Sequence, residues 1–366
     1  MGRLLSLQAA RECLRGRIRI LPTEWVGLSE AGGRVLAADV LATETIPARD
    51  NSVVDGYAMQ ASATRGASSA QPVRLSVMGE VAAGQVPDRA LGPGEALRIM
   101  TGAPLPRGAD AVVRCEVARE EGGKVAISAP VLPGADVRRA GQDFAPGDKV
   151  FPRGLRLHSH AIGTMAMLGR AQVPAVERPR VAVLATGDEL RDLGEPASAT
   201  HPVVASNLYM LEGQVREAGG IPLRMGIGRD REEELVVRLT EALRADVVVT
   251  TAGTGQGSRD LLRRVCQRLG AEILIDGVAI RPGSSTLVVH REGRWIFCLP
   301  GGPGSAWSAF HALVRPLLYR MQEAAPPSPI PAIAGEPIQT SRDLTHIVRG
   351  GSPGRVGRCA FSARRR

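Results

Sequence analysis

The sequence has no apolar run near the roughly 20 residues that a membrane-spanning helix requires, although 44% of its 366 residues are hydrophobic. We therefore expect no transmembrane segment. Residues 1–16 mix leucines with arginines, a pattern typical of an amphipathic helix and not of the unbroken apolar core of a signal peptide. A cytoplasmic location is the expectation that follows. The length predicts several folding units.

Aromatic residues are also scarce, at 3% of the chain, and only two lysines, Lys124 and Lys149, stand among its 46 basic residues. The net charge of +9 is unevenly spread, because the segment from Pro326 onward has seven arginines against two acids and supplies +5 of it. The body is thus only mildly basic and lacks the aromatic platforms of single-strand binders. We expect neither nucleic acid nor a membrane as a partner.

Paired cysteines are missing as well. The five cysteines are odd in number, widely scattered and form no Cys-x-x-Cys motif; they are Cys13, Cys115, Cys266, Cys298 and Cys359. They indicate reduced thiols, with neither a zinc site nor a disulfide framework. His158 and His160 have no partners at metal-ligand spacing, so we do not expect them to bind a metal.

The chain changes character near its middle. Residues 20–175 are rich in glycine, proline and valine, with alternating stretches at 73–77, 96–100 and 124–128, which predicts small β-rich units. Beyond about Arg180, short apolar runs alternate with helical periodicity, which predicts a doubly wound α/β domain. The expected strands are 181–184, 221–227, 246–250 and 295–299, and the expected helices are 207–218, 231–244 and 306–321. A proline-rich linker follows at 324–337, and the residues after it show no core pattern.

Loops at the ends of the buried strands are the first candidate site, because ligands of open α/β sheets bind at the carboxyl ends of the strands. Two loops, 253–257 and 301–304, are glycine-rich and lead into helices, so their N–H groups suit a phosphate. Close packing alone is the other reading, since neither a Walker motif nor a complete Gly-x-Gly-x-x-Gly occurs there. The third loop carries Asp188 and Glu189, and Asp260 follows the 253–257 loop. Acids beside a phosphate site indicate Mg²⁺, although each could instead cap a helix.

Three polar stretches stand out in the first half of the chain. Residues 50–57 place two acids, an amide and a hydroxyl around a turn, residues 98–104 end a predicted strand in a turn, and residues 138–143 set two arginines beside an acid. Taken singly, each stretch could be ordinary turn chemistry.

Taken in order, these segments resemble the MoeA-type molybdopterin molybdenumtransferases, the family that includes the gephyrin E domain. Residues 51–58 match the family's Asn-Ser-Ala-Met-Asp-Gly-Tyr-Ala, 98–104 contain its Ile-Met-Thr-Gly-Ala-Pro, and 138–143 match its Arg-x-x-Gly-Glu-Asp. The later matching segments are 186–190, 206–207, 246–260, 281–283 and 299–303. The resemblance spans about residues 1–322.

The resemblance implies an elongated, multidomain fold of α/β and β parts, in which a doubly wound, MogA-like molybdopterin-binding domain follows two smaller β-rich domains. The implied domains are 1–50 with 144–177 as a discontinuous dimerisation domain, 51–143 as an inserted β-rich domain, 178–323 as the α/β domain, and 324–366 as the remnant of a C-terminal β-barrel.

The resemblance also implies an activity, namely insertion of molybdate into adenylated molybdopterin with Mg²⁺-dependent release of AMP. The site would be shared between the subunits of a homodimer, and other molybdenum cofactor biosynthesis proteins would be further partners. The implied catalytic residues are Asp55, Thr101, Asp143, Glu189, Asp230 and Asp260. The implied cofactor-binding residues are Thr186, Gly187, Asp188, Asn207, Gly253, Thr254, Gly257, Arg281, Pro300, Gly301 and Pro303, and the implied metal ligands are Asp188, Glu189 and Asp260.

Several positions depart from the family pattern. The loop 252–257 lacks the usual serine, and three usual lysines are missing, with Arg281 in place of one of them. The other changed positions are Gly277 and Ser284 for lysines, Ala205 for an aspartate and Gly302 for an asparagine. The C-terminal β-barrel is reduced to a short arginine-rich tail.

Three hypotheses follow. The first is an active, divergent and C-terminally shortened molybdenumtransferase, and the second is a carrier that binds molybdopterin or a related nucleotide without transferring metal. The third is an enzyme of the related adenylylation step. The first half of the chain matches only the metal-inserting family, which favours the first hypothesis over the third. The choice between molybdate and tungstate stays open.

Overall fold

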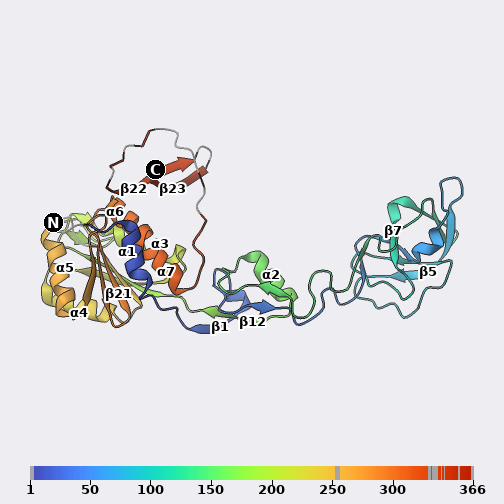
Figure 1. The fold of residues 1–366 in the computed structure, drawn as a ribbon, viewed down its shortest axis with the longest axis horizontal. Coiled ribbons are helices and arrows are strands. Elements are labelled where there is room, and N and C mark those ends of the chain that lie inside the picture. The colour runs from blue at the N-terminus through green and yellow to red at the C-terminus, as the bar shows by residue number, and fades with distance from the viewer. Residues whose placement is uncertain are drawn as a thin grey trace. The chain divides into compact units, whose positions relative to one another are not determined.

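The computed structural model describes residues 4–251, 256–328, 331, 337–338, 340–341, 343–352 and 355–363, with the side chains of 256–259 and 349–363 left out. The chain forms two compact units, one of Asp39–Pro152 and one of Met1–Ala38 with Arg153–Arg366 (Figure 1). The division into four domains stays a prediction. No helix within the described ranges is long and apolar enough to cross a membrane.

A six-stranded sheet forms the centre of the larger unit, in the order β16-β13-β17-β21-β20-β18. The first four strands are parallel, and β20 runs antiparallel to both of its neighbours. The strands are β13 (Arg180–Thr186), β16 (Ile221–Gly228), β17 (Val247–Thr251), β18 (Glu272–Asp276), β20 (Leu287–Arg291) and β21 (Arg294–Leu299). Every residue of β17 is buried, as in a parallel strand that is covered on both faces.

Helices cover both faces of this sheet. On one face, α1 (Leu7–Arg15) and α3 (Ser206–Glu217) pack with the C-terminal helices against Val181 and Val183 of β13. On the other face, α4 (Glu232–Ala242) and α5 (Gln256–Arg268) pack against the alternate residues of β13, Ala182 and Leu184. Figure 1 shows the two groups of helices on opposite sides of β21. The predicted doubly wound α/β domain is therefore confirmed, along with its expected strands.

The helix expected over 306–321 is divided in the structure. It consists of α6 (Pro303–Ala309), a wider π-type turn at Phe310–Val314, and α7 (Arg315–Met321). Pro316 explains the interruption, because proline has no N–H with which to bond the carbonyl four residues before it. That carbonyl, of Ala312, instead accepts a hydrogen bond of 2.9 Å from Nε of Arg11 on α1.

A separate two-stranded sheet of the same unit pairs β1 (Thr23–Gly27) with β12 (Gln172–Val176) in antiparallel fashion. The helix α2 (Ser159–Met167) lies between these strands in sequence order, and its Ala161 and Met165 are buried. A further short parallel pair, β14 (Leu190–Arg191) with β15 (Val203–Val204), follows β13.

The smaller unit contains its own six-stranded sheet, in the order β7-β4-β6-β5-β9-β8. The strands are β4 (Gly56–Met59), β5 (Val73–Val81), β6 (Glu95–Ile99), β7 (Ala111–Arg114), β8 (Ala118–Glu121) and β9 (Lys124–Ile127). Alternate residues of β4 enter two apolar clusters, with Tyr57 and Met59 in one and Ala58 in the other. The β-rich unit predicted from 73–77, 96–100 and 124–128 is thereby confirmed.

The smaller unit also contains two separate two-stranded sheets. The first joins β2 (Val40–Leu41) to β11 (Lys149–Phe151), and the second joins β3 (Asn51–Ser52) to β10 (Val137–Arg138).

The C-terminal segment, which showed no core pattern in the sequence, forms a hairpin of β22 (Thr345–Ser352) and β23 (Arg355–Ala363). Strand β22 also pairs in parallel with β19 (Ile280–Arg281), so that His346 lies beside Arg281. Sequence analysis missed the hairpin because its strands are rich in glycine and arginine, and because its pairing partner lies about sixty residues away, beyond any local periodicity.

Candidate active site

The carboxyl ends of β13, β16, β17 and β21 meet at one edge of the parallel sheet. A pocket of about 310 Å³ lies at this edge, and its lining includes Thr186, Glu189, Asn207, Thr251, Gly301 and Pro303. The strand order reverses between β13 and β17, which is the switch point where ligands of open α/β sheets bind. Four predicted cofactor-binding residues and one predicted catalytic acid thus line a single pocket.

Three carboxylates gather where β13 and β16 end. The backbone N–H of Asp230 donates a hydrogen bond of 3.2 Å to Oδ1 of Asp188. Oδ1 of Asp230 is buried and has no hydrogen-bond partner among the described residues. Burial, and next the charges of Asp188 and Glu189, raise the pKa of the Asp230 carboxyl above its ordinary value. This carboxyl is therefore a candidate to hold and transfer a proton.

Gly187 allows Glu189 to fold back over the loop. The backbone of Gly187 has a φ of +151°, a conformation that side chains with a Cβ rarely adopt. A Cβ at this position would lie 2.4 Å from Oε2 of Glu189. Glycine at 187 thus places the Glu189 carboxylate directly against the backbone at the pocket wall.

The N-terminus of α3 also faces the pocket, since Ala205, Ser206 and Asn207 line it. No side chain among the described residues caps this helix, so its positive dipole end stays available to an anion. Nδ2 of Asn207 donates a hydrogen bond of 2.7 Å to the carbonyl of Gly301. Its Oδ1 is buried without a partner among the described residues, in a residue that is 7% exposed. The pocket therefore offers an acceptor for a ligand N–H or O–H beside a site for an anion.

These acids fit a hard cation such as Mg²⁺, which takes one or two carboxylates and completes its shell with water and substrate phosphates. Asp188 is exposed, Glu189 is half-buried, and Asp230 contributes an unpartnered oxygen. Among the described residues, no three His, Cys, Asp or Glu side chains form a ready-made metal site. A cation here would accordingly share its ligands with the substrate.

The motifs of the smaller unit converge on a second set of polar groups. Oδ1 of Asp55 accepts hydrogen bonds from the backbone N–H of Thr101 at 2.7 Å and from its hydroxyl at 2.8 Å. These bonds lower the pKa of Asp55, the backbone bond having the larger effect. Asp143 forms an ion pair with Arg138, whose Nε donates to Oδ1 at 3.2 Å.

Backbone pairing brings these three segments together. Arg138 pairs with Asn51 between β10 and β3, and the N–H of Ser52 donates to the carbonyl of Ala103 at 2.9 Å. Asp50 accepts from the backbone of Ala140 at 2.8 Å and from the side chain of Arg139 at 2.7 Å. The stretches at 50–57, 98–104 and 138–143 are therefore neighbours in space.

Three of the remaining predicted residues, Asp260, Arg281 and Pro300, do not line the pocket. Asp260 lies in the second turn of α5 and is exposed, and Arg281 is exposed on β19. Pro300 lies directly after β21, where the strand ends. Gly253 and Thr254 lie outside the described residues, and of Gly257 only its backbone within α5 is described. The roles of these residues stay predictions.

Arg229 is one site residue that sequence analysis did not single out. Its guanidinium bonds to the loop that follows β13. Its position directly after a buried parallel strand, next to Asp230, is a signal that could have identified it.

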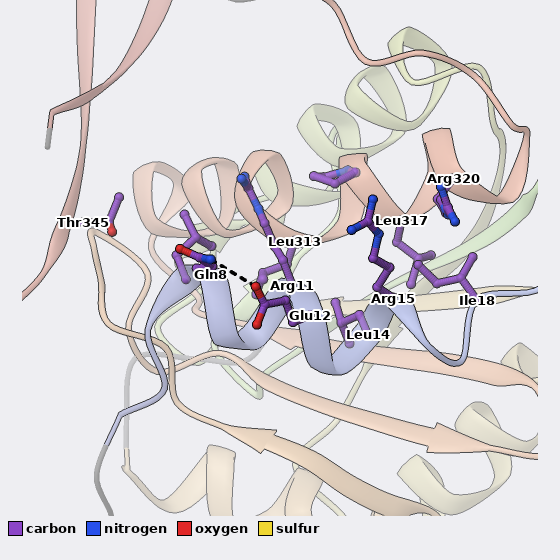
Figure 2. A pocket seen from close by; sticks show the side chains of 12 residues that line it. Gln8, Arg11, Glu12, Leu14, Arg15, Ile18, Leu313, Leu317, Arg320 and Thr345 are labelled. Atoms are coloured by element: carbon purple, nitrogen blue, oxygen red, sulfur yellow. Dashed lines mark hydrogen bonds between the residues drawn. The ribbon is translucent and has the colours of Figure 1, made fainter. Parts of the chain in front are cut away.

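A second pocket, of about 480 Å³, lies between α1 and the C-terminal helices. Figure 2 shows leucines and arginines around it, together with the hydrogen bond between Gln8 and Glu12. None of the predicted site residues lines this pocket. The pocket at the sheet edge is therefore the stronger candidate for catalysis.

Two family descriptions match the chain. The MoeA N-terminal region (domain I and II) matches residues 5–169, and a probable molybdopterin binding domain matches residues 182–320. Together they account for both the β-rich first half and the α/β domain with its pocket.

Curated relatives and solved structures agree with these matches. A molybdopterin molybdenumtransferase of Bacillus subtilis is 36% identical over 301 residues, which cover 81% of this chain and 70% of the relative. One from Staphylococcus aureus is 32% identical over 335 residues, covering 90% and 79%. The crystal structure of a molybdopterin biosynthesis MoeA protein from Pyrococcus horikoshii superposes with a TM-score of 0.83 at 30% identity, covering 95% of this chain and 87% of that one.

Proposed function

This chain belongs to the MoeA family of molybdopterin molybdenumtransferases, and from that membership we propose that it inserts molybdate into adenylated molybdopterin and releases AMP with the help of Mg²⁺. The family resemblance seen in the sequence and the predicted fold class are confirmed. A role in molybdenum cofactor biosynthesis follows from the family. The Mg²⁺ requirement and AMP release are the finer parts of the proposal.

The observation that carries this proposal is the meeting of anion-binding and acidic groups around one pocket. The uncapped end of α3 and the loop at Gly301 suit a phosphorylated, anionic substrate. The unpartnered Oδ1 of Asn207 suits a donor group of the same ligand. Glu189 lines the same pocket, and Asp188 and Asp230 are next to Glu189, where the three acids could bind a cation or move protons.

In the proposed reaction, two dithiolene sulfurs of the substrate form Mo–S bonds while two oxo groups of molybdate leave as water. A water molecule cleaves the phosphoanhydride, and AMP departs. Each oxo group that leaves as water takes up two protons. The dithiol releases two of the four as its Mo–S bonds form and solvent supplies the other two, which Asp230 can pass on because its raised pKa favours the protonated carboxyl. Glu189, at the pocket wall, can accept a proton from the attacking water. Mg²⁺, when bound, would neutralise phosphate charge and polarise the bond that breaks.

A carrier that binds the pterin without transferring metal is the second candidate. The observation in its favour is the absence of two family lysines, since Gly277 and an exposed Ser284 stand in their places. Arg281 keeps one positive charge there, although arginine presents its donors differently from lysine. Tight binding of adenylated molybdopterin without AMP release would favour this reading.

A single-turnover assay tests the proposal. Purified protein, adenylated molybdopterin, molybdate and Mg²⁺ are mixed, and AMP and molybdenum-bound pterin are followed together. Both products should form, and Glu189→Gln should abolish them while the fold is retained. Glu217→Gln is the matched control, because Glu217 is an exposed acid on α3 outside the pocket lining. Normal turnover by Glu189→Gln would remove that residue from the mechanism.

The homodimer, a cytoplasmic location and contact with other cofactor-biosynthesis proteins stay predictions drawn from the resemblance and the sequence. A monomeric mass in light scattering would contradict the first. Formation of adenylated pterin from ATP and molybdopterin in the same preparation would instead support the adenylylation hypothesis.

A further inference from the structure

We propose that Arg229 is a positioning residue of this site, which holds the loop 187–190 in place and, through that loop, the Glu189 carboxylate. The inference deepens the proposed function and rests on it for its catalytic consequence. Its structural part, that Arg229 secures the loop, stands on the hydrogen bonds alone.

The side chain of Arg229 reaches three acceptors through Nη1, which carries two N–H groups, so at least one N–H is shared between two carbonyls. Nη1 donates to the carbonyl oxygens of Gly187 at 3.3 Å, Asp188 at 3.1 Å and Leu190 at 2.8 Å. The backbone of Arg229 is itself held, because its N–H donates to Oε1 of Glu234 at 3.2 Å. The guanidinium of Arg229 thus binds three carbonyl oxygens of the loop 187–190.

Backbone hydrogen bonds also stabilise this loop. The N–H of Gly187 donates to the carbonyl of Gly228 at 3.1 Å, and the carbonyl of Glu189 accepts from Val203 at 3.2 Å. With the three Arg229 bonds, every carbonyl from 187 to 190 accepts a hydrogen bond. These bonds hold the loop in a conformation in which the Glu189 side chain lies against Gly187.

The charge of Arg229 has a second effect at the same place. Three carbonyl dipoles and the carboxylates of Asp188 and Glu189 would oppose an anionic substrate at the pocket. A guanidinium that binds the carbonyls offsets part of this negative potential, since bonds from a charged donor are stronger than neutral ones. A neutral glutamine can occupy the space of Arg229 but lacks the charge and the reach to three acceptors.

Amide hydrogen exchange tests the structural part in the apo protein. Arg229→Gln should speed exchange at Asp230 and at Leu190 by about tenfold or more, because the lost bonds involve a charged donor. Arg229→Lys should restore slow exchange in part, since one ammonium can replace a single nitrogen that serves several acceptors. Arg231→Gln is the matched control, because Arg231 is exposed and has no side-chain hydrogen bond among the described residues. Unchanged exchange in Arg229→Gln would overturn the inference.

A double-mutant cycle tests the catalytic part. Arg229→Gln should lower kcat by about 10- to 100-fold, as expected when a catalytic group is displaced by about 1 Å, with a smaller change in KM. If Arg229 acts through Glu189, adding Arg229→Gln to Glu189→Asp, which displaces the carboxylate but keeps a measurable rate, should cause much less further loss in kcat than Arg229→Gln causes alone. A multiplied loss would show that Arg229 acts independently and would overturn this part of the inference.

The two measurements separate the possible failures. Absence of turnover in the unaltered protein would reject the proposed function, while exchange rates would still decide whether Arg229 holds the loop. An unchanged kcat in Arg229→Gln, together with fast loop exchange, would reject the link from the loop to catalysis.

Discussion

Replacement of Gly187 by alanine tests how closely the loop after β13 controls the site. The added Cβ would lie 2.4 Å from Oε2 and 2.8 Å from Cδ of Glu189. To reach the 3.0 Å below which real Cβ contacts essentially never fall, Oε2 must retreat by at least 0.6 Å. A shift approaching 1 Å at a catalytic group costs up to about 100-fold in rate. We therefore expect Gly187→Ala to lose about 10- to 100-fold in kcat for molybdenum insertion.

The same substitution also strains the backbone, and a control is needed to separate the two effects. An alanine at this positive φ costs about 1–2 kcal/mol. Gly194 lies in the same connection with a φ of +91° and open space around its Cα. Gly194→Ala should therefore lower stability by a similar amount, seen as a melting temperature lower by about 2–8 °C, without displacing Glu189.

The assay compares both variants in single-turnover transfer and in thermal unfolding. Comparable destabilisation with loss of transfer only in Gly187→Ala is the expected result. Equal transfer rates in the two variants would refute the reasoning, because they would show that the placement of Glu189 against Gly187 has no catalytic weight.

Three further predictions concern pH, packing and the smaller unit. Burial, and next the charge of Arg315, lower the pKa of His311 from 6.5 to about 4. Between these two pH values His311 takes up a proton in the unfolded chain and not in the folded one, so the free energy of unfolding should fall by up to about 3 kcal/mol as the pH drops from 6.5 to 4. His311→Gln should reduce this fall in urea unfolding, and an unchanged pH dependence would contradict it. At Gly56 a Cβ would lie 2.0 Å from a carbonyl oxygen of the neighbouring strand, so Gly56→Ala should destabilise the smaller unit by about 3 kcal/mol or more. Gly122→Ala is the control, because a Cβ there has open space and the substitution should act only through the backbone. Limited proteolysis should therefore cleave the Gly56→Ala variant faster than the Gly122→Ala variant. Thr101→Val removes the hydroxyl, one of the two donors to Asp55, and should raise the pKa of Asp55. An unchanged pKa in an NMR titration of the Asp55 carboxyl would count against the hydrogen bond between Thr101 and Asp55.

Local patterns in the sequence were sufficient for most secondary structure. The valine-rich run at 246–250 predicted β17 because a parallel strand buried on both faces is apolar throughout. Periodicity predicted the helix at 207–218 in the same way, and α3 begins one residue earlier. The interruption at Phe310–Val314 was not anticipated, although Pro316 is its visible cause. The hairpin at the C-terminus was missed because its partner is distant in the chain.

The candidate site was only partly readable in advance. Asp188 and Glu189 were identified because they follow a buried strand, and Asn207 was identified through the family resemblance; the structure places all three around the strand ends. Asp55 and Thr101 were identified through the family resemblance, and their hydrogen bonds show that these segments meet. Arg229 was overlooked because its partners are backbone carbonyls, which leave no trace in the types of residue present.

The sequence by itself determined the succession of strands and helices, the family, and the set of acids available for chemistry, because these depend on residue type and short-range spacing. Only the tertiary structure decided which of those groups meet. Asp188 and Asp230 are 42 residues apart in the chain, and they are neighbours because β16 pairs beside β13 with both strands ending at the same edge. That pairing also buries Asp230, raises its pKa and brings Arg229 to the loop. Strand order and register are set by the packing of the whole domain, so contacts of this kind follow from the fold and not from any one segment.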